Sequence, residues 1–212
     1  MEHSTSGSVP LLIALHGYAG NKESMMSIAQ RINSRDVIIA SLQGPYQFSY
    51  PYGLKGFEVG QSGEIRIGFA WATRWKDRES IELHHRNVLS LIDEVAQAWP
   101  VDRSKVFLLG FSQPVALNYR FVFTYPDVIR GVIGVCGGVP GDWDTFSYKT
   151  SQTDVLHIAG ENDPFYSVER SEKFEGMLRQ RAANVEFCLY NESHRFPRRA
   201  IPLIGRWLKA RI

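Results

Sequence analysis

The stretch VFLLGFSQPVALNYRF, from Val106 to Phe121, decides the fold. Its apolar start, Val106 to Leu109, predicts a buried strand, and the residues after Pro114 have the spacing of a helix. Ser112 therefore stands on a strand-turn-helix corner, where a serine nucleophile would be presented. In such an elbow the serine backbone is strained and the residues two before and two after must be small. Gly110 fits this requirement, and Pro114 stands where glycine is usual.

The length and composition predict one folded domain over residues 1–212. A chain of 212 residues can bury one good core and is short for two ordinary domains. Its 44% apolar and 22% charged residues are close to the globular average. A formal charge of +2 is too small to indicate a nucleic-acid partner, and the basic C-terminal residues are read as a solvated helix face.

The two cysteines and the N-terminus indicate the compartment. Cys136 and Cys188 lie in apolar, strand-like runs, so buried free thiols are expected and a disulfide framework is not. No apolar run approaches the roughly 18 residues of a membrane span, and MEHSTSGSVP has no signal-peptide core. We therefore expect no membrane span and, as the default, a cytoplasmic protein.

Short solid apolar runs alternate with segments of helical periodicity. The predicted strands are Val9–Leu15, Val37–Leu42, Val106–Leu109, Ile129–Val135, Val155–Ala159 and Val185–Tyr190. The predicted helices are Glu23–Ile32, Ile81–Trp99, the segment after Ser112, Val168–Arg181 and Arg198–Arg211. This alternation predicts an α/β fold with a mostly parallel central sheet covered by helices on both faces.

The segment from Gly44 to about Lys76 reads as a long irregular loop rich in aromatic residues, Phe57 among them. A loop of that length inside a compact domain is normally functional, or it signals a wrong assignment. Its aromatics could line a pocket for an apolar group or cap the sheet edge, and the sequence leaves both readings open. It does not contain an obvious large lid insertion.

Four chemically capable segments follow predicted strands. His16-Gly17-Tyr18 follows the first strand and Ser112 the third, while Asp163 and His194 follow the fifth and sixth. Reacting groups of parallel sheets gather beyond the carboxyl ends of the strands, so one rim would hold a nucleophile, an acid and a base. A serine hydroxyl needs a neighbouring imidazole, which needs a carboxylate to fix its tautomer. The order serine, aspartate, histidine is that of α/β-hydrolase triads.

Two backbone N–H groups are predicted to stabilise the oxyanion. One belongs to Gln113, directly after the nucleophile, and the other to Tyr18, directly after His16-Gly17. Losing one such donor costs about 10²–10³ in turnover. The identity of the side chains at these two positions is expected to be secondary.

Other residues compete for each role. Cys136, in the string Gly134 to Gly138, could be a nucleophile, but a turn and not a helix follows it, so nothing would lower its pKa. For the acid, Glu161, Asp142 and Asp144 compete with Asp163, which is preferred because Pro164 sets a turn just past the fifth strand.

The remaining histidines are assigned structural positions. His157 is expected inside a strand, as a core or near-site residue, and His85 is expected to pack on a helix. His84 is expected on the surface and His3 in a frayed tail, and His16 is expected to shape the oxyanion loop. No pair of histidines or carboxylates has metal-ligand spacing, so no metal site is predicted.

The motifs resemble, in chain order, the phospholipase/carboxylesterase family of α/β-hydrolases, which includes the acyl-protein thioesterases. They are LHGYAGN, QGPYQF, GFAW, VDRSKVFLLGFSQPVAL, GENDPF and SHRF with a terminal WL, and together they cover nearly the whole chain. The resemblance implies Ser112 as nucleophile, Asp163 and His194 as its partners, and Tyr18 and Gln113 as oxyanion donors. It also implies Trp71 near the substrate and ester or thioester hydrolysis without a cofactor.

Three departures from the family pattern accompany the resemblance. Pro114 replaces a glycine, Ser193 precedes His194 where glycine is common, and Phe165-Tyr166 follow Asp163 where small aliphatic residues are frequent. Only Pro114 touches the mechanism: it pushes Gln113 away from helical backbone angles, which would re-aim a donor unless the elbow already holds Gln113 suitably.

The expected function is a carboxylesterase acting on small, soluble acyl esters. A thioesterase acting on acyl-proteins or acyl carriers is the alternative. A third reading is a catalytically silent hydrolase fold that binds a partner, in which Pro114 has disrupted the nucleophile elbow. The sequence sets neither the acyl chain length, nor the alcohol, nor the oligomeric state.

Overall fold

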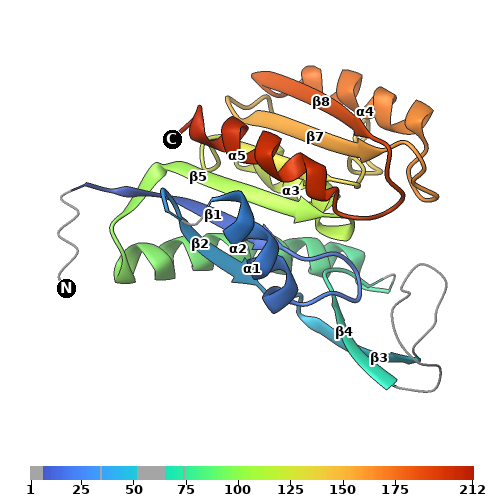
Figure 1. The fold of residues 1–212 in the computed structure, drawn as a ribbon, viewed down its shortest axis with the longest axis horizontal. Helices are drawn as coiled ribbons and strands as arrows, with labels where there is room; N and C mark the ends of the chain where they lie inside the picture. The colour runs from blue at the N-terminus through green and yellow to red at the C-terminus, as the bar shows by residue number, and fades with distance from the viewer. Residues whose placement is uncertain (1–6, 34, 52–64, 74) are drawn as a thin grey trace.

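The computed structural model describes residues 7–33, 35–51, 65–73 and 75–212, and its centre is a six-stranded parallel sheet (Figure 1). The strand order is β2-β1-β5-β6-β7-β8. The strands are β1 (Val9–Leu15), β2 (Ile38–Leu42), β5 (Val101–Phe111), β6 (Gly131–Val135), β7 (Asp154–Gly160) and β8 (Asn184–Tyr190). All five pairings between neighbours are parallel. The predicted parallel sheet is confirmed.

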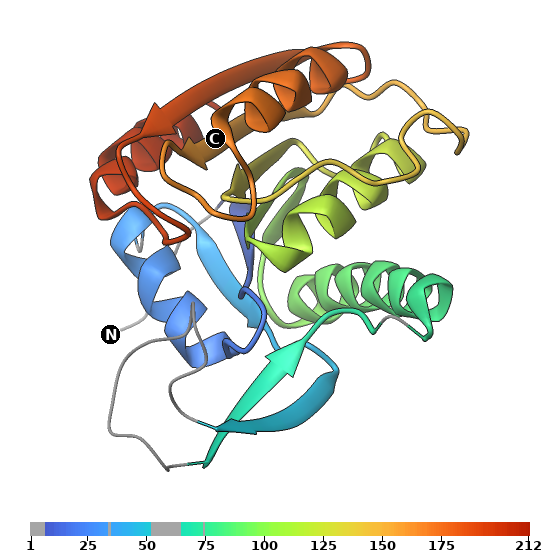
Figure 2. The ribbon, with the colours of Figure 1, turned by 90° about the vertical axis from the view of Figure 1, so that its right-hand side faces the viewer.

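Helices cover both faces of the sheet (Figure 2). The helices are α1 (Lys22–Ile32), α2 (Asp77–Ala98), α3 (Gln113–Thr124), α4 (Val168–Arg179) and α5 (Ile201–Lys209), the last preceded by a short 3-10 turn over Arg198–Ala200. Helices α1 and α5 pack on one face, and α2, α3 and α4 pack on the other.

The alternation of side chains along each strand explains the solid apolar runs. In β1, Leu11 and Ile13 contribute to the core under α2 and α3, whereas Leu12 and Ala14 contribute to the core under α1 and α5. Successive strand residues point to opposite faces, so a strand covered on both sides must be apolar throughout. Four residues in a row from Val106 are fully buried for this reason.

The predicted irregular segment contains a hairpin, which corrects the sequence reading. Strands β3 (Tyr46–Pro51) and β4 (Ile65–Ala70) pair antiparallel, outside the main sheet. The alternation of Tyr46, Phe48 and Tyr50 with polar residues is the signal that could have revealed β3. Phe57 lies outside the described residues.

The hairpin is attached to the loop that follows β1. The Ala19 backbone N–H donates to the Phe69 carbonyl at 3.0 Å, and Gly20 forms a bridge with Phe69. A side chain at Gly68 would meet the Ala19 Cα at 2.8 Å, so glycine permits this close approach. The hairpin therefore holds the loop that carries Tyr18.

One histidine assignment is wrong. His84 was expected on the surface, but it is 1% exposed. Helix α2 buries a wide stripe, and His84 lies between the Trp71 ring, 5.9 Å away, and Asn118 of α3, whose Oδ1 is 3.1 Å from Nε2. His85, 8% exposed, is packed on the helix as predicted. In the described ranges, no helix combines the length and the apolar character that a bilayer crossing requires.

Candidate active site

Ser112 occupies a strained corner between β5 and α3. Its φ of 62° and ψ of −115° lie outside the regions that ordinary residues prefer, and such strain persists only where the surroundings enforce it. The Ser112 N–H donates to the Val135 carbonyl at 2.8 Å, and the Ser112 carbonyl accepts from the Val115 N–H at 3.1 Å. A side chain at Gly110 would meet the Asn118 amide nitrogen at 2.7 Å. The predicted strand-turn-helix corner is therefore present, with the small residue it needs.

Ser112, His194 and Asp163 form one hydrogen-bonded chain. The Ser112 Oγ lies 2.8 Å from His194 Nε2, and His194 Nδ1 lies 2.7 Å from Asp163 Oδ2. An ionised carboxylate only accepts hydrogen bonds, so Nδ1 carries the ring proton and Nε2 is left to accept from the serine hydroxyl. The structure thus brings together three residues that β5, β7 and β8 deliver from distant parts of the sequence.

Asp163 is fixed by the turn that follows it. Its Oδ1 accepts the backbone N–H groups of Phe165 at 2.8 Å and Tyr166 at 3.1 Å. The second oxygen remains for the imidazole, and the side chain is 0% exposed. Two backbone donors and one imidazole therefore hold the buried carboxylate in a single orientation.

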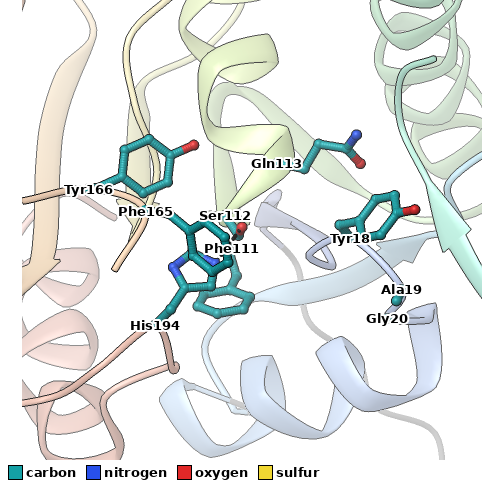
Figure 3. A pocket seen from close by; sticks show the side chains of 9 residues that line it. All are labelled: Tyr18, Ala19, Gly20, Phe111, Ser112, Gln113, Phe165, Tyr166 and His194. Carbon is teal, nitrogen blue, oxygen red and sulfur yellow. Dashed lines mark hydrogen bonds between the residues drawn. The ribbon is translucent and has the colours of Figure 1, made fainter. Parts of the chain in front are cut away.

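The predicted oxyanion residues lie on the other side of Ser112. Figure 3 shows Tyr18 and Gln113 on one side of the serine, and His194 with Phe165 on the other. Gln113 is the first residue of α3, a position at which a backbone N–H has no intrahelical acceptor. Tyr18 follows Gly17 in the loop after β1, and its ring stacks on Phe48 of the hairpin at 4.8 Å.

Pro114 is accommodated at the second position of α3. The N–H groups of a helix's first turn have no intrahelical partner, so an imino nitrogen costs nothing there. The helix still begins at Gln113, directly before the proline, and the Pro114 ring is buried. The departure from glycine therefore leaves the start of α3 intact.

The Gln113 side chain has a contact that sequence reasoning missed. Its Oε1 accepts from the Trp71 backbone N–H at 2.8 Å, and its Nε2 lies 3.4 Å from the Ala72 carbonyl. The amide thus joins the start of α3 to the segment after β4. The expectation that the identity of this side chain is secondary does not account for this contact, which arises because the fold brings the two segments together.

His16 and Trp71 contact the loop that carries Tyr18. The Gly44 N–H donates to His16 Nε2 at 2.9 Å, which leaves Nδ1–H to donate to the Gly17 carbonyl at 2.8 Å. Burial lowers the pKa of His16, which keeps the ring neutral. His16 therefore contacts the loop that it is predicted to shape, and the role of this loop in oxyanion binding stays a prediction.

The Trp71 side chain is buried behind the loop that follows β1. It is 0% exposed, and its indole N–H donates to the His16 carbonyl at 2.7 Å. The ring lies behind the described pocket wall, and the expectation that Trp71 lies near the substrate stays a prediction. A motif alone cannot distinguish a residue that lines a site from one packed behind it.

A pocket of about 560 Å³ opens at Ser112 (Figure 3). Its walls are mainly aromatic and include Tyr18, Phe111, Phe165 and Tyr166. A second hollow of about 880 Å³, lined by Phe48 and Trp75 of the hairpin region, shares Tyr18 and Gln113 with it. The two hollows meet at the predicted oxyanion donors. Tyr46, Phe48 and Trp75 therefore line a hollow beside the site, which agrees with one of the two readings left open above.

The competing nucleophile is poorly placed. Cys136 is 1% exposed, and its Sγ lies 3.3 Å from the Arg195 carbonyl. Burial, with the negative charge of Asp163 as a smaller contribution, raises the pKa of the Cys136 thiol to about 12. A thiol that keeps its proton is a weak nucleophile.

The structure distinguishes Asp163 from the competing acids. Asp142 pairs with Arg120 at 2.6 Å and accepts from the Tyr148 hydroxyl at 2.8 Å, in a separate hollow. Asp144 and Glu161 are exposed. Asp163 is the carboxylate that contacts the imidazole.

The other described histidines are structural. His157 is fully buried in β7, with Nδ1 2.8 Å from the Tyr119 hydroxyl, and burial lowers its pKa to about 4. Burial also lowers the pKa of His84 to about 3. His3 lies outside the described residues, and within the described part of the chain no group of three or more His, Cys, Asp and Glu side chains could hold a metal ion.

Comparisons with known proteins agree with this architecture. The family model described as phospholipase/carboxylesterase matches residues 2–212. A putative hydrolase, MhqD, from Bacillus subtilis (strain 168) is 24% identical over 211 residues, covering 100% of this chain and 97% of that protein. Carboxylesterase SOBER1 from Arabidopsis thaliana is 26% identical over 141 residues, covering 64% of this chain and 61% of that protein.

Among solved structures, the Bacillus cereus carboxylesterase is similar with a TM-score of 0.75 and 21% identity. The similarity covers 99% of this chain and 91% of that one. At this level of identity the comparison concerns the fold.

Proposed function

The chain belongs to the phospholipase/carboxylesterase family of ester hydrolases, and we propose that it cleaves carboxylic esters through an acyl-enzyme on Ser112. The observation that carries the proposal is the unbroken chain from the Ser112 Oγ through the His194 imidazole to the Asp163 carboxylate. Its three members are presented at the carboxyl ends of three strands of a parallel sheet, where such folds carry their chemistry.

The first half-reaction transfers the acyl group to the enzyme. His194 Nε2 takes the Ser112 proton as the Ser112 Oγ forms a bond to the ester carbonyl carbon, and the carbonyl oxygen becomes an oxyanion. When the tetrahedral species collapses, the bond to the leaving oxygen breaks and His194 gives its proton to that oxygen. Asp163 accepts the hydrogen bond from His194 Nδ1–H throughout and stabilises the imidazolium. The second half-reaction repeats the steps with water in place of the alcohol and releases a carboxylic acid.

Two backbone donors are proposed for the oxyanion, the N–H groups of Gln113 and Tyr18. Both residues border the same pocket as the serine hydroxyl. A preorganised pair of donors stabilises the transition state because it does not need to reorient as charge develops. Loss of one donor raises the activation free energy by roughly 2.7–4 kcal/mol. The bond from Gln113 Oε1 to the Trp71 N–H supports this arrangement by fixing the start of α3.

The strained Ser112 backbone also helps to position the hydroxyl and the proposed oxyanion donor. Its positive φ is enforced by hydrogen bonds at both its N–H and its carbonyl. The turn exposes the hydroxyl above the sheet and lets the next N–H face the same space.

A fluorophosphonate probe tests the proposal directly. The serine oxygen would displace fluoride from phosphorus, so the enzyme is expected to be labelled stoichiometrically at Ser112. Labelling should be absent in Ser112→Ala and sharply reduced in His194→Ala. If the wild-type protein folds and stays unlabelled, it is a catalytically silent module and the proposal fails.

A further inference from the structure

The aromatic walls around His194 lie on the side of Ser112 where a leaving group must depart. His194 Nε2 takes the serine proton and later delivers it to the leaving oxygen, so this oxygen has to come within about 2.6–3.2 Å of Nε2. Tyr18 and Gln113 occupy the opposite side of the serine (Figure 3). A group attached to the leaving oxygen therefore emerges beside His194, and the acyl group lies elsewhere around the carbonyl carbon.

Three rings surround the imidazole on this side. The ring centroid of Phe165 lies 4.8 Å from that of His194, with the planes at 70°. Phe111 lies at 5.4 Å and Tyr166 at 6.1 Å, with planes at 34° and 30° to the imidazole. All three border the 560 Å³ pocket. Phe165 is 54% exposed, so a large part of its ring is available to a ligand.

The backbone that carries Phe165 and Tyr166 is held by hydrogen bonds, and the Tyr166 ring is also packed. The backbone N–H groups of Phe165 and Tyr166 are bound by Asp163, the same carboxylate that orients His194. Tyr166 packs with Phe174 at 6.3 Å and with the Arg170 guanidinium at 5.6 Å. A side chain at Gly138 would meet Tyr166 Cε1 at 2.9 Å, so the back of the ring is closed by backbone. The Tyr166 side of the pocket wall is therefore packed from behind, and the backbone position of Phe165 is fixed.

Among the residues that the structure describes, the wall contains no charged group that would recognise an ionic leaving group. Asp163 is fully covered and already holds three hydrogen bonds. The described lining consists of the imidazole, a serine, a glutamine, aromatic rings and small residues. Planar apolar groups gain most from such walls, because aromatic pairs contribute about 0.5–1.5 kcal/mol beyond the area they bury.

We propose that this pocket is a leaving-group site for a neutral aromatic alcohol, with Phe165 as its specificity-determining residue. The substrate class is then the aryl ester, whose product alcohol is a phenol. The proposal rests on the function proposed above, because it uses His194 as the donor to the leaving oxygen. Phe165 acts on the choice of leaving group and not on the chemistry of the acyl transfer.

The test compares two acetate esters of different alcohols, phenyl acetate and trifluoroethyl acetate, in wild type and three variants. Phe165→Leu removes the ring and keeps most of the volume, Phe165→Ala removes both, and Phe165→Tyr restores a ring. The intrinsic reactivities of the two esters cancel when the ratio of their kcat/KM values is compared between proteins. Fluorophosphonate labelling in each variant reports whether Ser112 and His194 still work.

The ratio of phenyl to trifluoroethyl hydrolysis is expected to fall about three- to tenfold in Phe165→Leu and Phe165→Ala and to stay near wild type in Phe165→Tyr. Labelling should remain in all variants. An unchanged ratio in Phe165→Leu, or equal losses on both esters, would overturn the leaving-group assignment while leaving the esterase proposal standing. If wild type is neither labelled nor active on either ester, the proposed function itself fails.

Discussion

The hydroxyl oxygen of Ser112 lies 2.8 Å from Nε2 of His194, although 82 positions in the sequence separate the two residues. The contact depends on the strained turn after β5 and on the loop after β8 reaching the same edge of the sheet. It places a hydroxyl where an imidazole can take its proton, and several expectations depend on it.

Replacing Asp163 by asparagine should reduce turnover strongly. An asparagine that still accepts the Phe165 and Tyr166 N–H groups through its oxygen presents an NH₂ group to His194 Nδ1. The ring must then carry its proton on Nε2, where it cannot accept from Ser112, and the analogous change in a serine protease lowers kcat by about 10⁴-fold. Steady-state kinetics on a nitrophenyl ester measure the loss, and circular dichroism checks the fold. Retention of more than a tenth of wild-type kcat would exclude Asp163 as the orienting acid.

Gln113→Ala should weaken the arrangement of α3 and the segment after β4. The Trp71 N–H, at 2.8 Å from Oε1, would lose its acceptor, and an unsatisfied buried donor costs about 1–3 kcal/mol. Both thermal stability and kcat are expected to fall, with a smaller change in KM. Gln113→Met is the matched variant because it keeps the length of the side chain and removes the acceptor oxygen. If Gln113→Met has the stability and kcat of wild type, the hydrogen bond from the Trp71 N–H has no positioning role.

Pro114→Gly should alter turnover more than substrate affinity. Glycine restores an N–H and frees the backbone next to Gln113, whose own N–H is the proposed oxyanion donor. We expect kcat to change and KM to stay within about twofold, while the free energy of unfolding falls by about 1 kcal/mol because the unfolded chain gains freedom. Parallel measurement of kcat, KM and urea denaturation separates the effects. A kcat equal to that of wild type would mean that the proline is a bystander.

Cys136→Ala should leave the enzyme active. Burial raises the pKa of this thiol to about 12, so it stays protonated at neutral pH, and its Sγ lies beside the Arg195 carbonyl. Removal of a small buried group is expected to lower stability by about 1 kcal/mol without changing fluorophosphonate labelling. A loss of labelling in a variant that still unfolds cooperatively would indicate that Cys136 takes part in the reaction.

His85→Phe should make the protein less sensitive to acid. Burial, and then the nearby Arg120 charge, lower the pKa of His85 from its ordinary value of 6.5 to about 4. Between these values the unfolded chain binds a proton that the folded protein does not, so stability is lost as the pH falls below about 6.5. One such group contributes a loss of about 1 kcal/mol between pH 7.5 and 5.5.

Phenylalanine does not titrate, and it fits a ring position that lies 5.4 Å from Phe121 and 5.6 Å from Tyr125. It also removes the buried Nε2 that has no hydrogen-bond partner. Urea denaturation at pH 7.5 and 5.5 should show a smaller pH-dependent loss in the variant than in wild type. An equal loss in the two proteins would place the acid sensitivity in other groups.

The sequence predicted much of the sheet because the information is local. Strands buried on both faces must be apolar at every position. A run such as Leu11 to Leu15 can therefore be recognised as a strand without knowing which strands pair with it. The Ser112 corner is also local, since a strand, a small residue, a serine and a helix follow one another directly. The order of Ser112, Asp163 and His194 along the chain then indicated the arrangement that the structure brings together.

The tertiary structure decided whatever depends on contacts between segments far apart in sequence. Trp71 and His84 are buried because the loop after β1, the end of β4 and helices α2 and α3 meet there, and no periodicity within one segment reports this. The β3–β4 hairpin went unnoticed because its aromatic alternation is short and resembles a loop. The aromatic wall of the pocket around His194 also depends on contacts between distant segments. Phe165 and Tyr166 appear in the sequence only as two residues after an aspartate, and they become the side of a pocket because Asp163 binds their N–H groups while reaching the imidazole.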